Sequence, residues 1–190
     1  MKMIRYAAFL AITAGTFISC VTGPSPEVTK NDFSQKGPTQ AVLAYGAFID
    51  SRPMFPYQLE RLNFIQVNPA LKPQDVYAVT NRGAKNWYAA DVEPGGSFKL
   101  IYSETIRNRT IYIYVPGVQG KTAIDFRAPK EPGLFFAGEV RIRKDGDNQV
   151  DNTPETELKI LKSMVQDFAG SEWQPVIMAR VKELENAKSK

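Results

Sequence analysis

The stretch FAGEVRIR, residues 136–143, decides the fold class because its side chains alternate along the chain. The even-numbered positions carry Phe, Gly, Val and Ile, whereas the odd-numbered positions from 139 onward carry Glu, Arg and Arg. Successive side chains of a β-strand point to opposite faces, so a period of two residues is typical of a strand with one buried face. We therefore predict a strand here whose apolar face packs against a core.

Seven similar runs precede this strand and are separated by turn signals rich in Pro, Gly and Asn. They occupy residues 41–49, 59–67, 76–80, 87–92, 98–103, 110–115 and 124–127. No helical periodicity lies between them, which argues against a βαβ sheet. Many short strands favour a mainly β fold, an antiparallel β-sandwich over residues 39–145, with an antiparallel barrel as the alternative. The run at 110–115 is apolar on both faces, so we expect it to be a central strand.

Two local repeats support the sandwich. Pro94-Gly95 and Pro132-Gly133 each stand just before an aromatic strand, where Pro restricts φ and Gly accepts a positive φ. This pattern resembles the prealbumin-like and carboxypeptidase-regulatory-like sandwiches of exported bacterial proteins, including lipoproteins of unknown function. The resemblance implies the same fold class and a non-catalytic accessory role.

The C-terminal segment, residues 146–190, differs from the strands before it. A polar stretch at 145–152 is predicted to be a turn, and a helical pattern begins after it. Thr153 fits the N-cap of a first helix, with Pro154 at the first helical position. Gly170 is the expected stop of that helix.

A second helix is predicted directly after this glycine, with Ser171 and Gln174 as its capping box. Its apolar stripe consists of Trp173, Val176, Ile177, Val181 and Leu184. The two helices predict a C-terminal helical hairpin over residues 146–190, packed on the sandwich. The alternative is that the stripe around Trp173 docks a partner protein.

The N-terminus has the pattern of a secretory signal peptide over residues 1–19. Lys2 and Arg5 precede an apolar run at 6–18, which is shorter than the roughly 20 residues of a membrane-spanning helix. The run ends at Cys20, the only cysteine of the chain.

Ile18-Ser19-Cys20 at the end of this run resembles the lipobox of bacterial lipoproteins, although Phe17 stands where that family usually has Leu. The resemblance implies cleavage before Cys20, a diacylglyceryl group on its thiol and acylation of the new amino terminus. It also implies an exported protein, anchored to a membrane of the cell envelope by its lipids. Val21, in place of an inner-membrane retention Asp, favours the outer membrane.

Residues 20–38 then form a lipidated tether, rich in Pro, Gly and small polar residues. An uncleaved signal anchor and a free thiol in an exported protein are the alternatives at Cys20.

Composition excludes several function classes. The 190 residues contain no histidine and one cysteine, so His-dependent catalytic triads, His-based metal sites and an intrachain disulfide are excluded. Without the signal peptide, 22 basic and 20 acidic side chains remain, and a net charge of +2 predicts no nucleic-acid partner.

The acidic stretch near the predicted turn is a weak candidate for a metal site. Asp145, Asp147 and Asp151 offer the oxygen ligands that calcium prefers, but the stretch lacks the Gly and the final Glu of a calcium-binding EF-hand loop. The favoured interpretation is a solvated turn without a metal.

Three further groups of side chains are candidate functional sites. Acid–base chemistry would need a close carboxylate pair, for which the candidates are Asp91 with Glu93 and Asp125 with Glu139. An aromatic platform for sugars or peptides would use Trp87, Tyr88, Tyr112 and Tyr114. A basic face would use Arg107, Arg109, Arg141 and Arg143. For all three groups we favour a structural interpretation: the charged residues lie on solvated strand faces, and the aromatic residues belong to the core.

The sequence thus predicts a non-catalytic binding or assembly module at the cell envelope, without a cofactor, that binds an envelope protein. The alternative is a lipoprotein that binds a glycan, peptide or calcium through its aromatic or Asp-rich surface. An enzyme would require a cleft with converging carboxylates or a Ser/Lys pair. A protein-binding module would instead show an exposed apolar patch or an open sheet edge.

Overall fold

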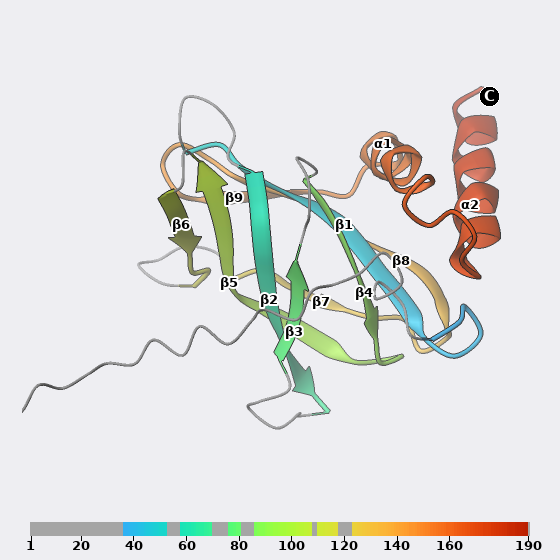
Figure 1. Ribbon diagram of the computed structural model, residues 1–190, viewed down its shortest axis with the longest axis horizontal. Coiled ribbons are helices and arrows are strands. Elements are labelled where there is room, and N and C mark those ends of the chain that lie inside the picture. The colour runs from blue at the N-terminus through green and yellow to red at the C-terminus, as the bar shows by residue number, and fades with distance from the viewer. Residues whose placement is uncertain are drawn as a thin grey trace, which may run out of the picture.

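The computed structural model describes residues 36–52, 58–69, 76–80, 86–107, 110–117 and 123–189. Within these ranges the chain forms nine strands and two helices (Figure 1). The strands are β1 (Val42–Asp50), β2 (Gln58–Asn68), β3 (Val76–Thr80), β4 (Trp87–Val92), β5 (Ser97–Arg107), β6 (Thr110–Tyr114), β7 (Asp125–Arg127), β8 (Gly133–Ile142) and β9 (Asn148–Asp151). The helices are α1 (Pro154–Met164) and α2 (Trp173–Lys188).

The strands form two sheets that pack face to face. The four-stranded sheet has the order β4-β1-β8-β9, and the five-stranded sheet has the order β3-β2-β5-β6, with β7 paired to the other end of β5. Leu59 and Leu62 of one sheet share a buried cluster with Val140 and Ile142 of the other. The predicted mainly β fold with C-terminal helices is therefore confirmed.

The two helices form a third layer, on the side of the four-stranded sheet that faces away from the five-stranded sheet (Figure 1). Strand β1 lies between the two apolar layers, and nearly all of its residues are buried. Leu43, Tyr45 and Ala47 pack against the helices, whereas Phe48 packs between the sheets. Burial on both faces explains why the run at 41–49 is almost continuously apolar.

The pairing of β1 with β8 corrects one part of the predicted fold. Both strands run in the same direction, so the four-stranded sheet is mixed and the expectation of a wholly antiparallel sandwich is wrong. Parallel neighbours need a long connection. Here the chain between β1 and β8 includes the whole five-stranded sheet and β4, which is long enough to return it in the same direction.

A β-bulge in β8 changes the face that its even-numbered residues occupy. The register passes from Tyr45 opposite Phe136 to Gly46 opposite Gly138, so Ala137 is the extra residue. Phe136 consequently packs on the helix side, whereas Val140 packs between the sheets. The prediction that residues 136–142 present one continuous apolar face is therefore wrong, although the strand itself exists.

Two further predictions about strands are corrected. The sequence predicts a turn at Asn148–Asp151, but this segment forms β9 and pairs antiparallel with β8. Pairing with an existing strand overrides the turn preference of these polar side chains. Strand β6, expected in the centre of a sheet, is the last strand of its sheet among the described residues.

The helical hairpin follows the sequence pattern at its first cap and departs from it at its second. Thr153 is the N-cap of α1. The helix ends at Met164 with Val165 as its C-cap, so the prediction that Gly170 stops it is wrong. Gly170 has a φ of +79° in the turn that follows. Helix α2 begins at Trp173, with Glu172 at its N-cap and no side-chain cap. The Ser171 hydroxyl instead donates to the carbonyl of Phe168, so the predicted capping box is wrong.

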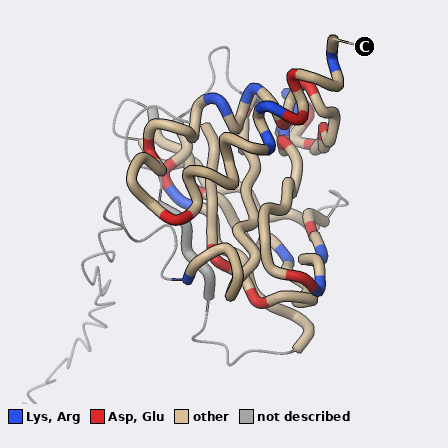
Figure 2. Tube along the Cα trace, turned by 90° about the vertical axis from the view of Figure 1, so that its right-hand side faces the viewer, with Lys and Arg blue, Asp and Glu red and all other residues tan. Residues whose placement is uncertain are grey.

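Charged side chains on the helices pair locally with one another. Lys162 of α1 lies 2.6 Å from Glu185 of α2, and Arg180 lies 2.8 Å from Glu183. Across the described residues, Lys and Arg are interspersed with Asp and Glu along the trace (Figure 2). Exposed pairs of this kind contribute little to folding stability, so the apolar layers carry most of it.

Candidate binding surface

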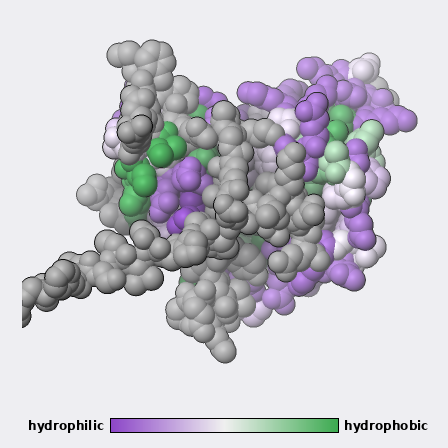
Figure 3. Space-filling view, in the orientation of Figure 1, coloured by the Kyte–Doolittle hydropathy of each residue, from purple (hydrophilic) through white to green (hydrophobic). Residues whose placement is uncertain are grey.

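Strand β6 presents apolar side chains to solvent at the end of the five-stranded sheet. Ile111 is 57% exposed and Ile113 is 58% exposed. Val115, directly after the strand, is exposed as well. A hydrophobic patch is visible over β6, bordered by a hydrophilic area (Figure 3). The edge of this sheet therefore carries the kind of apolar surface that a folded chain normally buries.

The register with β5 shows which face this patch occupies. Ile113 lies opposite Glu104, and Ile111 lies opposite Ile106. Tyr114 and Ser103, which face each other in the same register, are buried. Because side chains alternate along a strand, Ile111 and Ile113 belong to the outward face of the sheet.

An ion pair with a buried carboxylate, Asp50–Arg52, lies at the end of β1. The Asp50 carboxylate is fully buried and accepts two hydrogen bonds from the Arg52 Nε, at 2.9 and 3.2 Å, and one from Nη2, at 2.6 Å. Thr105 Oγ1 also donates to Asp50, and the Arg52 guanidinium lies 5.5 Å from the centre of the Tyr114 ring. These contacts join the end of β1 to Thr105 of β5 and to the ring of Tyr114 in β6.

A second buried carboxylate joins the helices to the four-stranded sheet. Glu157 of α1 accepts hydrogen bonds from Tyr45 of β1 and from two guanidinium nitrogens of Arg180 of α2. Burial raises the pKa of Glu157, but the bonds from Arg180 and Tyr45 outweigh that effect, and the net pKa lies below its usual value. Burial and the bond to Glu157 raise the pKa of Tyr45. Tyr45, Glu157 and Arg180 thus form hydrogen bonds with one another, which indicates a structural role.

The acidic candidates for calcium ligands, Asp145, Asp147 and Asp151, each accept hydrogen bonds from residues close by in sequence. Asp145 accepts from the backbone N–H of Asp147, and Asp147 accepts from that of Asn148. Asp151 accepts from the backbone of Thr153 and from the Thr156 hydroxyl, and these bonds lower its pKa. In the described parts of the chain, no group of three His, Cys, Asp or Glu side chains could hold a metal ion.

The predicted carboxylate pairs are used in other contacts. Asp125 belongs to the five-stranded sheet and Glu139 to the four-stranded one, where Glu139 accepts a 2.7 Å bond from Arg141. Asp91 accepts a hydrogen bond from the backbone of Lys36, and Glu93 is exposed.

The four arginines weighed as a basic face fall into two groups. Arg141 pairs with Glu139, and Arg143 lies 3.9 Å from Asp145, so both are neutralised by neighbouring carboxylates. Arg109 and the side chain of Arg107 lie outside the described residues.

The four aromatic residues weighed as a platform occupy three different places. Trp87 is buried under the helices, and Tyr88 and Tyr114 are buried between the sheets. Of the four, Tyr112 alone is exposed. The fold therefore separates them, and the apolar surface at β6 is made by isoleucines instead. The uncharged run at 110–115 was the signal for that surface, but it fits a buried strand equally well.

The apolar stripe of α2 faces the rest of the chain. Trp173 is 1% exposed, and its Nε1 donates to the carbonyl of Lys36, just before β1. Ile177 and Leu184 are buried in the same cluster. The stripe is thus occupied within the protein, as the hairpin prediction required, and does not form a docking face.

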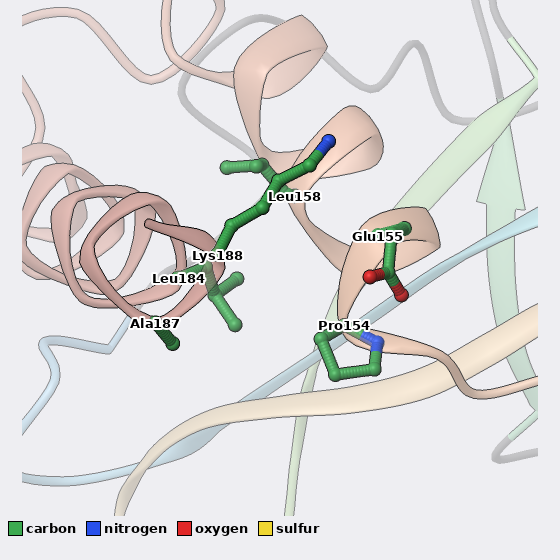
Figure 4. Close-up of a pocket in the computed structure, with 6 residues that line it drawn as sticks. All are labelled: Pro154, Glu155, Leu158, Leu184, Ala187 and Lys188. Carbon is green, nitrogen blue, oxygen red and sulfur yellow. The ribbon is translucent and has the colours of Figure 1, made fainter. Parts of the chain in front are cut away.

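A shallow groove of about 160 Å³ lies between the start of α1 and the end of α2 (Figure 4). It is lined by Pro154, Glu155, Leu158, Leu184, Ala187 and Lys188. Sites for small-molecule ligands usually exceed about 300 Å³ and hold several converging polar groups. The groove is smaller than that, and β6 is the stronger candidate for a functional surface.

Cys20, the predicted signal peptide and the tether up to residue 35 lie outside the described residues. None of the helices in the described part of the chain is long and apolar enough to cross a membrane. Comparisons with protein-family models, curated proteins and solved structures find no match to this chain. Its function must therefore be argued from its own surface and N-terminal sequence.

Proposed function

We propose that this protein is a non-catalytic binding or assembly module of the bacterial cell envelope that binds a partner protein along β6. The observation that carries the proposal is the exposure of Ile111 and Ile113 on an uncharged strand at the end of a sheet. Folded proteins commonly guard such edges with charges, Pro, bulges or covering segments, because an open edge pairs readily with another strand.

Strand addition gives this edge a binding mechanism. The backbone groups of an added strand form hydrogen bonds to the edge, and its side chains pack on the existing face. At β6 the outward face offers Ile111 and Ile113, beside the half-buried Ile106 of β5. The Asp50–Arg52 pair contacts Thr105 of β5 and the ring of Tyr114 in β6, which supports the strands beneath this surface.

The N-terminal sequence supports the envelope location in this proposal. A signal pattern that ends at Cys20 implies a lipid anchor, in the outer membrane by the identity of Val21. Anchoring confines the module to a membrane surface and raises the effective concentration of any partner held there. A weak interaction at β6 is then sufficient for assembly.

Crosslinking in cells tests the binding surface. Tagged wild type, Ile113→Lys and Met178→Lys are crosslinked, purified from the membrane fraction and analysed by mass spectrometry for any bound protein, including a second copy. Met178 is the matched control because it is 52% exposed and lies on α2, remote from β6 (Figure 1). We expect wild type and Met178→Lys to retain the same crosslinked species and Ile113→Lys to lose it. Equal recovery by all three variants would refute β6 as the binding surface.

The lipid anchor is tested separately with Cys20→Ser. Wild type is expected to incorporate labelled palmitate and to fractionate with the outer membrane, whereas Cys20→Ser should do neither. Palmitate on Cys20→Ser, or an unlabelled wild type, would contradict the anchor. Thermal unfolding of both forms controls for folding.

A further inference from the structure

We propose that Asp91 of β4 and Trp173 of α2 form a clamp on Lys36, and that this clamp fixes the point at which the N-terminal tether leaves the folded domain. The clamp would limit how far the domain can move from its lipid anchor. The inference rests on the proposed function in one respect, the anchor at Cys20, and it does not depend on what binds at β6.

Both backbone polar groups of Lys36 bind side chains from distant parts of the chain. Its N–H donates to Asp91 Oδ2 at 3.1 Å, and its carbonyl accepts from Trp173 Nε1 at 3.0 Å. The register of β1 with its two neighbouring strands begins only at Val42. The two side chains therefore hold Lys36 at a place outside the strand ladder.

The residues after Lys36 lead directly from the clamp into β1. A Cβ on Gly37 would contact the side chain of Glu172, the N-cap residue of α2. The Gly37 carbonyl accepts from the backbone N–H groups of Gln40 and Ala41, which closes a turn. The blue segment before β1 accordingly lies beside the lower end of α2 (Figure 1). The chain is thus held from the clamp up to the sheet.

Burial of Trp173 makes release of the clamp unfavourable. Its side chain is 1% exposed and belongs to the same buried cluster as Leu43 and Ile177. A buried indole N–H needs an acceptor, and movement of Lys36 away from α2 would remove the acceptor of this donor. We therefore expect the clamp to stay closed as long as α2 is packed on the sheet.

The clamp sets the length of the tether. Residues 21–35 lie between Cys20 and Lys36, and these 15 residues extend at most about 50 Å. If the clamp opened, residues 36–41 would join the tether, because β1 begins at Val42, and would add about 20 Å to its reach. A shorter tether keeps the domain at a higher effective concentration near the membrane. Packing of α2 is thereby coupled to the reach of the anchor.

Limited proteolysis of the full-length protein, with a protease that cleaves after lysine, tests the clamp. Lys30 lies in the predicted tether and Lys36 lies in the clamp, so each molecule carries its own reference site. Mass spectrometry follows the new N-termini at Asn31 and Gly37. We expect cleavage after Lys36 to be about tenfold slower than after Lys30, because it requires local opening. Equal rates in wild type would overturn the clamp.

Trp173→Phe removes the indole donor and keeps an aromatic ring in the core. We expect it to speed cleavage after Lys36 several-fold and to leave the rate after Lys30 unchanged. Ile177→Val is the matched control, because it shortens a buried side chain of the same helix and cluster and keeps the donor to Lys36. Urea unfolding measures the stability of both variants. If Ile177→Val exposes Lys36 as much as Trp173→Phe, protection reflects overall stability and the clamp is wrong.

The β4 side of the clamp provides a second pair of variants. Asp91→Ala removes the acceptor of the Lys36 N–H, whereas Asp91→Asn keeps an oxygen that can accept this bond. We expect the alanine variant to be cleaved faster after Lys36 and the asparagine variant to stay close to wild type. Wild-type rates in both Asp91→Ala and Trp173→Phe would overturn the clamp.

Cys20→Ser separates this inference from the proposed function. The clamp contacts lie within the folded domain, so the ratio of the two cleavage rates should be the same with and without the lipid. Slow cleavage after Lys36 in a wild type that carries palmitate supports both proposals. Rapid cleavage after Lys36 in a protein that carries palmitate overturns the clamp alone. If wild type carries no palmitate, there is no membrane tether to fix, and the inference fails together with the anchor.

Discussion

The hydroxyl of Tyr45 donates a 2.6 Å hydrogen bond to Oε1 of Glu157, across 112 positions of sequence. Tyr45 lies in β1 and Glu157 in α1, so this bond joins the four-stranded sheet to the helical layer. Both groups are buried, and Arg180 of α2 neutralises the carboxylate. Glu157 therefore links β1, α1 and α2 through its hydrogen bonds with Tyr45 and Arg180.

A double-mutant cycle with Tyr45→Phe and Glu157→Gln measures this tie. We expect each single variant to lower the free energy of unfolding, and the pair to be coupled by about 1–2 kcal/mol, because a buried bond to a charged acceptor is lost. Urea denaturation gives the four free energies. The amide oxygen introduced by Glu157→Gln can still accept from Tyr45, so strict additivity would show that the negative charge of the acceptor adds nothing to this bond.

Glu157 also predicts a pH dependence of stability. Its pKa in the folded protein lies below its usual 4.5, so the folded state favours the carboxylate form. The resulting stabilisation is present above the unfolded pKa and is lost as pH falls through the folded pKa. Wild type should therefore lose stability more steeply than Glu157→Gln as pH falls below about 4.5. If the urea midpoints of wild type and Glu157→Gln fell by equal amounts as pH is lowered, the lowered pKa of Glu157 would be contradicted.

The glycine at the bulge of β8 should resist substitution. Gly138 has a φ of +96°, and an added Cβ would contact the side chain of Asn152 and lie 2.9 Å from Val150. We expect Gly138→Ala to cost about 2–3 kcal/mol from backbone strain and overpacking. Gly117→Ala is the control, with a φ of +75° and open space around it, and should cost about 1 kcal/mol. Similar losses at both sites would show that packing at the bulge is unimportant.

The buried pair at the end of β1 should be sensitive to removal of one partner. Arg52→Met leaves the fully buried Asp50 carboxylate without its counter-ion, which we expect to cost about 3 kcal/mol. The double variant Asp50→Asn/Arg52→Met removes the charge as well and should recover a large part of the loss. Urea unfolding distinguishes the two results. A double variant no more stable than Arg52→Met would show that the uncompensated charge is not the cause.

The local pattern of the sequence was sufficient to locate most strands. Residues 76–80 and 87–92 coincide with β3 and β4, and Gly95 and Gly133 adopt the positive φ expected at the start of β5 and β8. Thr153 caps α1 as predicted. These features depend on side-chain alternation, φ restriction and capping, which act between near neighbours in sequence.

The candidate site depended on information that local pattern lacks. An apolar run such as residues 110–115 has the same composition whether it is central or at an edge, and only the sheet order distinguishes the two. Its isoleucines could therefore not be identified as exposed. The aromatic residues were misleading for the same reason, since Trp87 and Tyr88 are neighbours in sequence but pack into different apolar layers.

Local sequence pattern is enough to locate most strands, both helices and the N-terminal pattern that ends at Cys20, but it misses β9. The parallel pairing of β1 with β8, the change of face at the β8 bulge and the exposed position of β6 depend on how distant segments pack together. The physical reason is the range of the interactions. Alternation and capping are read within a few residues, whereas strand order follows from how two sheets and a helical layer share their buried surfaces.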